Sequence, residues 1–135
     1  MSLLSLTVKT SSRNQMIDLT GEIEHILSRE GWDSGILTVY VPHTTAAITV
    51  NENADPSVRR DILHYLSKLI PQNAGFTHME GNSDSHIKTS LVSPSITLIV
   101  ENGKLVLGTW QSVFFCEFDG PRTRKVYLKF IKDNN

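Results

Sequence analysis

The sequence predicts an α+β fold for residues 1–135, a single domain of mostly antiparallel β-sheets packed with two main helices. Three observations predict this class. Apolar and polar residues alternate along several β-branched stretches. Two other segments carry an apolar stripe with helical spacing. The last strands are joined by short turns, which favour antiparallel pairing. The chain length is that of one domain with a proper core.

The expected strands, roughly seven in all, fall in segments rich in Val, Ile, Leu, Thr and Phe. These segments are 4–10, 35–44, 46–52, 95–108, 112–118 and 124–131. Pro42 marks a bend or an edge between two of them. Asn102-Gly103 is a strong hairpin signal. The sequence "DGPR", residues 119–122, predicts the turn between the last two strands.

The first helix is expected to begin near Thr20, a plausible N-cap, and to end at Gly31. The second is expected to begin at Asp55, with Pro56 in the first helical position, and to end before Pro71. Its apolar stripe consists of Val58, Ile62, Leu66 and Leu69.

Composition excludes several classes of protein. The net charge is -1 with 20% charged residues, which argues against a nucleic-acid binder and against disorder. Cys116 is the only cysteine, so neither an intrachain disulfide nor a thiolate-rich zinc site is expected. The first residues do not resemble a signal peptide, and no apolar run has the length of a membrane span. We therefore expect a soluble cytoplasmic protein.

Two sequence stretches are unusually rich in groups that carry chemistry. "FTHMEGNSDSHIKTS", residues 76–90, places His78 and His86 among carboxylates and amides and is interpreted as a site-forming loop. Together with His43, which follows a strand, these histidines could bind either a metal ion or an anion. His25 and His64 are interpreted instead as residues on helix surfaces.

The second stretch is "NENADP", residues 51–56, where polar groups follow a strand and precede the long helix. Such strand ends often carry active-site groups. Asp55 has a structural role as a helix cap, whereas Glu52 has no capping or turn role there. The segment Gly81 to Asp84 is either a tight turn or a set of donors and acceptors for a substrate.

Three long segments, "VPHTTAAITVNENADPSVRRDIL", "HMEGNSDSHIKTSLVSPSITL" and "GKLVLGTWQSVFFCEFDGPRTRKV", resemble the YjbQ-like family, which is associated with secondary thiamine-phosphate synthase activity. The resemblance covers about residues 35–130, with Met79 as a departure where many members carry a polar residue. It implies small α+β subunits that form homotrimers. It also implies one cleft holding His43, Glu52, Asn53, His78, Asn82, Asp84 and His86.

The implied activity joins a pyrimidine diphosphate to a thiazole phosphate and releases pyrophosphate, and it can be a side reaction of a protein with another task. The candidate catalytic residues are Glu52 and Asp84. The candidate substrate residues are Thr44, Asn53, Arg60, Asn82, Ser83 and Arg122, of which Thr44, Arg60 and Arg122 are expected to hold phosphate. The expected ligands of a divalent metal, zinc or magnesium, are His43, His78 and His86, which lie outside the two long helices and beside strand ends. Two alternatives stay open. One is a metal-dependent hydrolase with Glu52 as general base. The other is a non-catalytic ligand-binding trimer.

The stretch "VFFCEF", residues 113–118, carries large apolar side chains on both alternating faces. A single sheet face cannot bury both sets, so either a second subunit or a helix of the same chain must cover the other face. Together with the resemblance, this pattern predicts a homotrimer. Cys116 in this stretch is interpreted as a small buried hydrophobe rather than a nucleophile.

Overall fold

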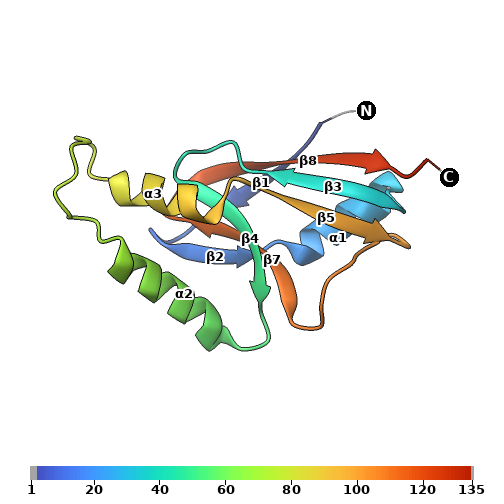
Figure 1. Ribbon diagram of the computed structural model, residues 1–135. Coiled ribbons are helices and arrows are strands. Elements are labelled where there is room, and N and C mark those ends of the chain that lie inside the picture. Colours follow the sequence, from blue (N-terminus) through green and yellow to red (C-terminus); the bar gives the residue numbers. More distant parts are fainter. Residues whose placement is uncertain (1–2, 135) are drawn as a thin grey trace.

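The computed structural model describes residues 3–134 as two antiparallel β-sheets packed face to face, with three helices around them (Figure 1). The larger sheet has the order β1-β8-β3-β5-β6 and the smaller one β2-β7-β4. The strands are β1 (Leu4–Lys9), β2 (Gln15–Asp18), β3 (Gly35–Tyr40), β4 (Ala46–Glu52), β5 (Ser95–Glu101), β6 (Lys104–Leu105), β7 (Gln111–Glu117) and β8 (Thr123–Lys132). The α+β prediction is confirmed.

The core lies between the two sheets. The larger sheet contributes Leu37, Val39, Val126, Leu128 and Phe130, and the smaller sheet contributes Ile48, Val113 and Phe115. Residues of each set alternate along their strands with residues that point away from the core, as the period of two requires. The predicted hairpin is present: Val100 pairs with Leu105, and Asn102 and Gly103 both have positive φ.

Helix α1 (Thr20–Glu30) closes the space between the sheets with Ile23, Ile26 and Leu27. It ends at Gly31 in the left-handed conformation, as predicted. Its N-cap is Leu19, one residue before the prediction. Thr20 has a different role, because its hydroxyl accepts a hydrogen bond from the backbone N–H of Val113 at 2.8 Å.

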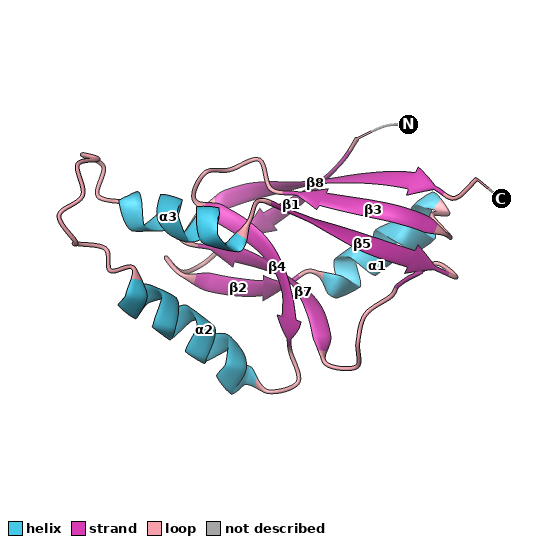
Figure 2. Ribbon diagram, in the orientation of Figure 1, coloured by secondary structure: helices cyan, strands magenta, loops and turns pink. Residues whose placement is uncertain are grey.

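Helix α2 (Pro56–Leu69) lies over the outer face of the smaller sheet (Figure 2). Asp55 caps it as predicted, its carboxylate accepting from the N–H of Ser57. The helix covers Phe114 and Cys116 of β7 with Ile62 and Leu66. The second apolar face of β7 is therefore covered by the same chain, so this pattern by itself does not require a partner subunit.

Helix α3 (Ser83–Val92) was not predicted, because residues 76–90 were interpreted as a loop. Only the first part of that stretch is irregular, and the second part is helical. Four of the α3 residues are buried, and all four are polar: Asp84, Ser85, Lys88 and Thr89. Without a buried apolar stripe, the sequence does not carry the usual signal of an amphipathic helix.

Candidate functional site

A polar cavity of about 710 Å³ lies where the β3–β4 connection, the start of α3 and the start of β8 meet. It is lined by Tyr40, Pro42, His43, Thr44, Thr45, His78, Glu80, Asn82, His86, Arg122 and Arg124. We call it the polar pocket. It unites six of the residues assigned from the sequence to substrate or metal, and it adds Arg124, which was not singled out. The six are His43, Thr44, His78, Asn82, His86 and Arg122.

His43 lies in the β3–β4 connection and is fixed by the neighbouring strand. The backbone N–H of Lys125 in β8 donates a hydrogen bond to Nε2 of His43 at 3.0 Å. A neutral imidazole that accepts at Nε2 carries its proton on Nδ1. Burial, followed by the positive charge of Arg124, lowers the pKa of His43 below its ordinary value. His43 is therefore favoured as a neutral ring with a donor at Nδ1.

Arg124 forms a buried ion pair with Glu117. Its Nε donates to Oε1 of Glu117 at 2.8 Å, and its Nη2 bonds Oε2 of the same carboxylate and the hydroxyl of Thr45. The Glu117 side chain is 0% exposed and that of Arg124 is 5% exposed. Glu117 also accepts from the hydroxyl of Thr10 and from the N–H of Asp119, both at 2.9 Å. Burial opposes the charge on Glu117, but these donors outweigh it and lower the pKa of the carboxyl.

A second carboxylate holds Arg122 and Asn82 together. Asp119 accepts from Nη2 of Arg122 at 2.9 Å and from the amide nitrogen of Asn82 at 2.8 Å. Because Asp119 and Arg122 lie in the turn between β7 and β8, this turn connects α3 to the sheet that carries Arg124. Gly120 is required in the turn, since a Cβ there would lie 2.3 Å from the carbonyl oxygen of Ser12.

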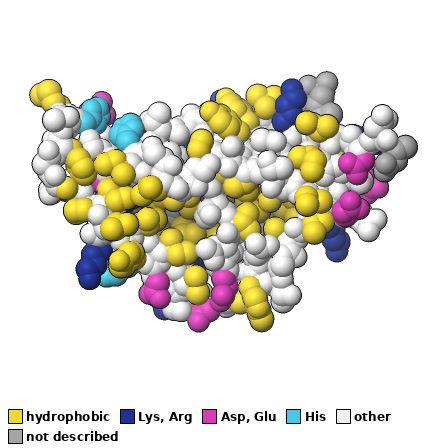
Figure 3. Space-filling model, in the orientation of Figure 1, with side chains coloured by type: hydrophobic (Ala, Val, Ile, Leu, Met, Phe, Trp, Pro, Cys, Tyr) yellow, Lys and Arg dark blue, Asp and Glu magenta, His cyan; other side chains and the backbone are white. Residues whose placement is uncertain are grey.

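His78 and His86 approach each other at the opening of the polar pocket. Their ring centroids are 5.5 Å apart in an edge-to-face arrangement. Nε2 of His78 lies 3.9 Å from a carboxylate oxygen of Glu80. Figure 3 shows histidine side chains gathered at the upper left end of the molecule, over the start of α3. The two rings come from different segments, His78 from the loop and His86 from the first turns of α3.

Asp84 and Ser83 belong to α3 but do not line the polar pocket. Asp84 accepts two hydrogen bonds from Arg13, at 3.0 and 3.1 Å, and lies 3.4 Å from Nζ of Lys88. The side chains of Asp84 and Lys88 are each 1% exposed. This arrangement makes Asp84 the attachment of α3 to the β1–β2 connection, and it leaves the carboxylate no contact with the pocket.

The "NENADP" residues lie at the other end of β4. Strand β4 has 7 residues, so at about 3.3 Å per residue its ends are about 20 Å apart. Thr44 and Thr45 precede its start, whereas Glu52 ends it and Asn53 and Arg60 follow. Asn53 instead accepts from Arg59 and donates to Asp18 at 2.8 Å. Within one chain, these residues are not brought to the polar pocket.

The three histidines of the polar pocket were expected to bind a divalent ion. His43, His78 and His86 line the same pocket, but no group of three His, Cys, Asp or Glu within residues 3–134 is arranged to hold a metal ion. One reason is visible at His43, whose Nε2 lone pair already accepts the Lys125 N–H. As they stand, the residues do not fit a three-histidine site.

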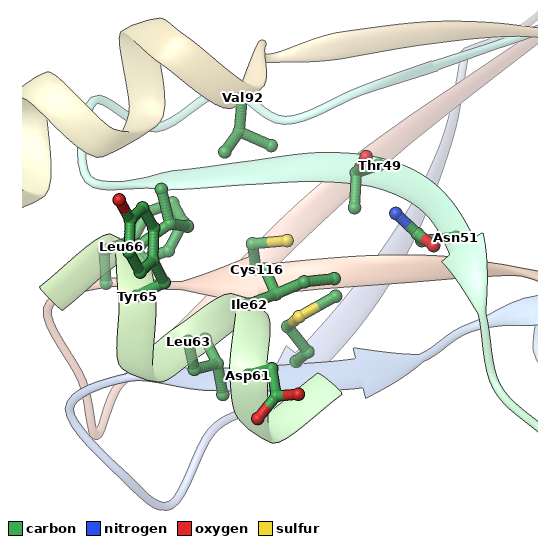
Figure 4. Close-up of a pocket in the computed structure, with 11 residues that line it drawn as sticks. Thr49, Asn51, Asp61, Ile62, Leu63, Tyr65, Leu66, Val92 and Cys116 are labelled. Carbon is green, nitrogen blue, oxygen red and sulfur yellow. The ribbon is translucent and has the colours of Figure 1, made fainter. Parts of the chain in front are cut away.

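A second cavity, of about 460 Å³, is apolar and lies between α2 and the outer face of the smaller sheet. In Figure 4, Ile62 of α2 lies beside Cys116 of β7, and Val92 approaches from the end of α3. Burial raises the pKa of the Cys116 thiol to about 12. A thiol with so little tendency to ionise is a poor nucleophile, which agrees with its interpretation as a small hydrophobe.

Together, the fold and the polar pocket define a small α+β protein whose pocket is lined by histidine and arginine. Residues 4–133 match the family described as UPF0047 protein YjbQ-like, and the chain belongs to this family. It is 55% identical to the UPF0047 protein MJ1081 of Methanocaldococcus jannaschii, over 97% of this chain and 95% of the relative. It is 51% identical to the UPF0047 protein YugU of Bacillus subtilis, over 96% of this chain and 98% of the relative.

Solved structures show the same fold. An uncharacterised YjbQ/UPF0047 protein from Clostridium acetobutylicum has a TM-score of 0.92 at 51% identity, covering 95% of this chain and 99% of that one. A hypothetical protein from Aeropyrum pernix K1 has a TM-score of 0.92 at 41% identity, covering 98% of this chain and 100% of that one. In residues 3–134, no helix combines the length and the apolar character needed to cross a membrane.

Proposed function

We propose that this protein is a cytoplasmic transferase resembling thiamine-phosphate synthase, which joins a pyrimidine diphosphate to a thiazole phosphate. The observation that carries the proposal is the polar pocket, which brings two arginines and three histidines around about 710 Å³. Cavities of this size accept small molecules. Arginine and imidazole donors suit a phosphorylated substrate.

The proposed reaction requires stabilisation of a leaving group. The bond between the pyrimidine methylene carbon and a pyrophosphate oxygen breaks, and a bond from that carbon to the thiazole nitrogen forms. Pyrophosphate leaves with the electron pair, so the protein must stabilise negative charge on its oxygens. Arg122, the hydroxyl of Thr44 and the imidazoles at the pocket opening are the groups that we assign to this task.

We also propose that the working form is a homotrimer. Glu52 and Asn53 lie at the far end of β4, about 20 Å along the strand from the residues of the polar pocket, and Arg60 does not line that pocket either. A trimer can bring them to the pocket of a neighbouring subunit, which would reunite the residues that the family resemblance assigns to one cleft. Exposed apolar side chains such as Tyr65, Leu69 and Trp110, each about 60% exposed, offer surface for such contacts.

The transferase proposal predicts that His86 matters for turnover whereas a helix-surface histidine does not. His86→Ala is expected to lower kcat/KM with the two phosphorylated substrates by about 10²-fold, the effect of one positioned acid, base or anion-stabilising group. His64→Ala is the matched control, since His64 is exposed on α2 and does not line the pocket. The assay is pyrophosphate release by the purified protein, with complementation of a strain that lacks thiamine-phosphate synthase. Equal activity of the two variants contradicts the assignment.

A divalent ion, zinc or magnesium, is a separate proposal for this pocket. Among the described residues, none forms a hydrogen bond with the ring nitrogens of His78 or His86. A carboxylate oxygen of Glu80 lies 3.9 Å from Nε2 of His78. His43 can join them only if its ring releases the N–H of Lys125. The alternative of a hydrolase with Glu52 as general base is not supported by the fold of one chain, because Glu52 lies at the end of β4 that is far from the polar pocket.

Zinc titration at two pH values separates a cation site from an anion site. Because a metal requires neutral imidazole, zinc should bind more tightly at pH ~7.5 than at pH ~5.5, on either side of the ordinary histidine pKa. The measurement is calorimetric titration of metal-free protein. Absence of binding at the higher pH, or weaker binding there than at the lower pH, removes the metal proposal.

A further inference from the structure

Arg124 keeps one guanidinium nitrogen free although the side chain is almost fully buried. Nε and Nη2 are taken up by Glu117 and Thr45. Nη1 has no hydrogen-bond partner among residues 3–134. It is also absent from the fully buried atoms that lack a partner, so it keeps some contact with solvent. Since Arg124 lines the polar pocket, Nη1 is the donor that this side chain has left for a ligand.

The orientation of this donor is fixed before any ligand binds. A guanidinium is planar, so two bonds from Nε and Nη2 to the carboxylate of Glu117 define the plane in which Nη1 lies. Thr10 and the N–H of Asp119 hold that carboxylate in turn. A donor whose direction is set in advance loses little freedom on binding, which favours affinity.

His43 supplies a second fixed donor beside the first. Its Nε2 accepts the N–H of Lys125, the residue that follows Arg124 in β8, so its neutral ring carries a proton on Nδ1. Both His43 and Arg124 line the polar pocket. The pocket thus has two donors from different segments, Arg124 on β8 and His43 in the β3–β4 connection, and each is oriented by a partner that does not line the pocket.

We infer that Arg124 Nη1 and His43 Nδ1–H form an anion subsite that binds a phosphoryl group of the substrate, and that His43 is a hydrogen-bond donor rather than a metal ligand. The identification of the anion as phosphoryl rests on the proposed function, whereas the two donors are properties of the chain itself. Any metal ion in this pocket would then be held by His78 and His86 without His43.

The first test is the tautomer of His43, observed by long-range ¹H–¹⁵N NMR correlation in the wild-type protein. The expected result is a proton on Nδ1 and an unprotonated Nε2 in neutral solution. Addition of inorganic phosphate should shift the His43 and Arg124 side-chain signals. A proton on Nε2 in the free protein overturns the inference, and so does a zinc-induced shift that places the metal on His43.

The second test is the affinity for inorganic phosphate and pyrophosphate, measured by calorimetry or NMR titration at constant ionic strength. Arg124→Lys retains a charge beside Glu117 but removes the planar fork, and it should weaken binding at least tenfold. His43→Ala, in a connection outside the strands, should weaken it about threefold to tenfold, the range of one neutral hydrogen bond. If Arg124→Lys does not fold, His43→Ala and the tautomer still decide the question.

Lys129→Gln is the matched control, because it removes one positive charge from the exposed face of the same strand. It should change phosphate affinity less than about twofold, since exposed charges act weakly at a distance in salt. Equal losses in Lys129→Gln and Arg124→Lys would show a general charge effect and overturn the subsite. Phosphate binding that depends on Arg124, in a protein with no transferase turnover, would keep the subsite and remove the proposed function.

Discussion

Replacing Glu117 by alanine is expected to lower the free energy of unfolding by about 3–5 kcal/mol, the usual cost of leaving one member of a buried ion pair without its partner. Arg124 would keep its charge in a site where its side chain is only 5% exposed. The hydroxyl of Thr10 and the N–H of Asp119 would also lose their acceptor. Since small domains are stable by only about 5–15 kcal/mol, this variant should be near the limit of folding.

Denaturant unfolding of matched variants tests this expectation. Thr10→Val removes the hydroxyl that donates to the Glu117 carboxylate and accepts the N–H of Arg122, and it should cost about 1.5–3 kcal/mol, less than Glu117→Ala. A double variant, Glu117→Leu with Arg124→Met, replaces the pair by apolar side chains and should be far more stable than Glu117→Ala. The double variant should nevertheless lose phosphate binding, because it lacks the donor at Nη1. A cost below about 1 kcal/mol for Glu117→Ala would mean that Arg124 reaches water when unpaired.

Much of the fold could be predicted because local signals and tertiary packing agree. Asp55 with Pro56, Gly31, and Asn102 with Gly103 occupy the positions that helix caps and hairpins require. The strands between them alternate because each sheet buries one face on the common core. Strand β2 (Gln15–Asp18) was missed because 4 residues are too few to show a period.

Helix α3 could not be predicted from periodicity, because it is held in place by charges. Three of the four side chains that it buries, Asp84, Ser85 and Lys88, are hydrogen-bonded polar groups. Lys88 donates to Asn14 at 3.2 Å and to Ser67 at 3.3 Å. These partners come from two distant segments, and no local sequence pattern predicts them. A polar residue that is buried by long-range pairing looks the same in the sequence as one that is solvated.

Only part of the candidate site could be predicted, again because some of its polar residues are buried through long-range pairing. The histidine-rich stretch does line a pocket, and Asn82 and Arg122 meet there through Asp119. Arg124 was missed because it sits in an ordinary alternating strand, where its partner Glu117 is seven positions away across a turn. Glu52 was placed with His43 by resemblance, although the two lie at opposite ends of one strand in the chain.

Replacing Asp84 by alanine is the second substitution expected to be severe, again by about 3–5 kcal/mol of unfolding free energy. It would leave Lys88 buried without its carboxylate and free the guanidinium of Arg13. Because Asp84 attaches α3 to the β1–β2 connection, the start of α3 should loosen, and with it the position of His86. The control is Lys88→Met, which removes the buried cation, leaves Asp84 paired with Arg13, and should cost much less. Thermal unfolding and hydrogen exchange of α3 amides measure both effects.

The pH dependence of these variants identifies the charge responsible. In the native protein, burial opposes ionisation of Asp84, but the hydrogen bond and charge of Arg13 and the charge of Lys88 outweigh it and lower the pKa of the carboxyl. The stability that Asp84 contributes should therefore be fully present above its unfolded pKa of ~3.9 and be lost as the pH falls through its lower folded value. Below that range, Asp84→Ala and the wild-type protein should become similar in stability.

At alkaline pH the stability of Asp84→Ala is expected to depend on the protonation of Lys88. Burial lowers the pKa of Lys88 against the opposing influence of Asp84, so removing Asp84 should lower it further. Between that folded value and the unfolded lysine pKa of ~10.4, the unfolded chain binds more protons than the folded one, and stability rises with pH. Asp84→Ala should thus recover part of its lost stability toward pH ~10, whereas the double variant with Lys88→Met should not. A parallel pH profile for the two would place the cost of the substitution on Arg13 or on packing instead.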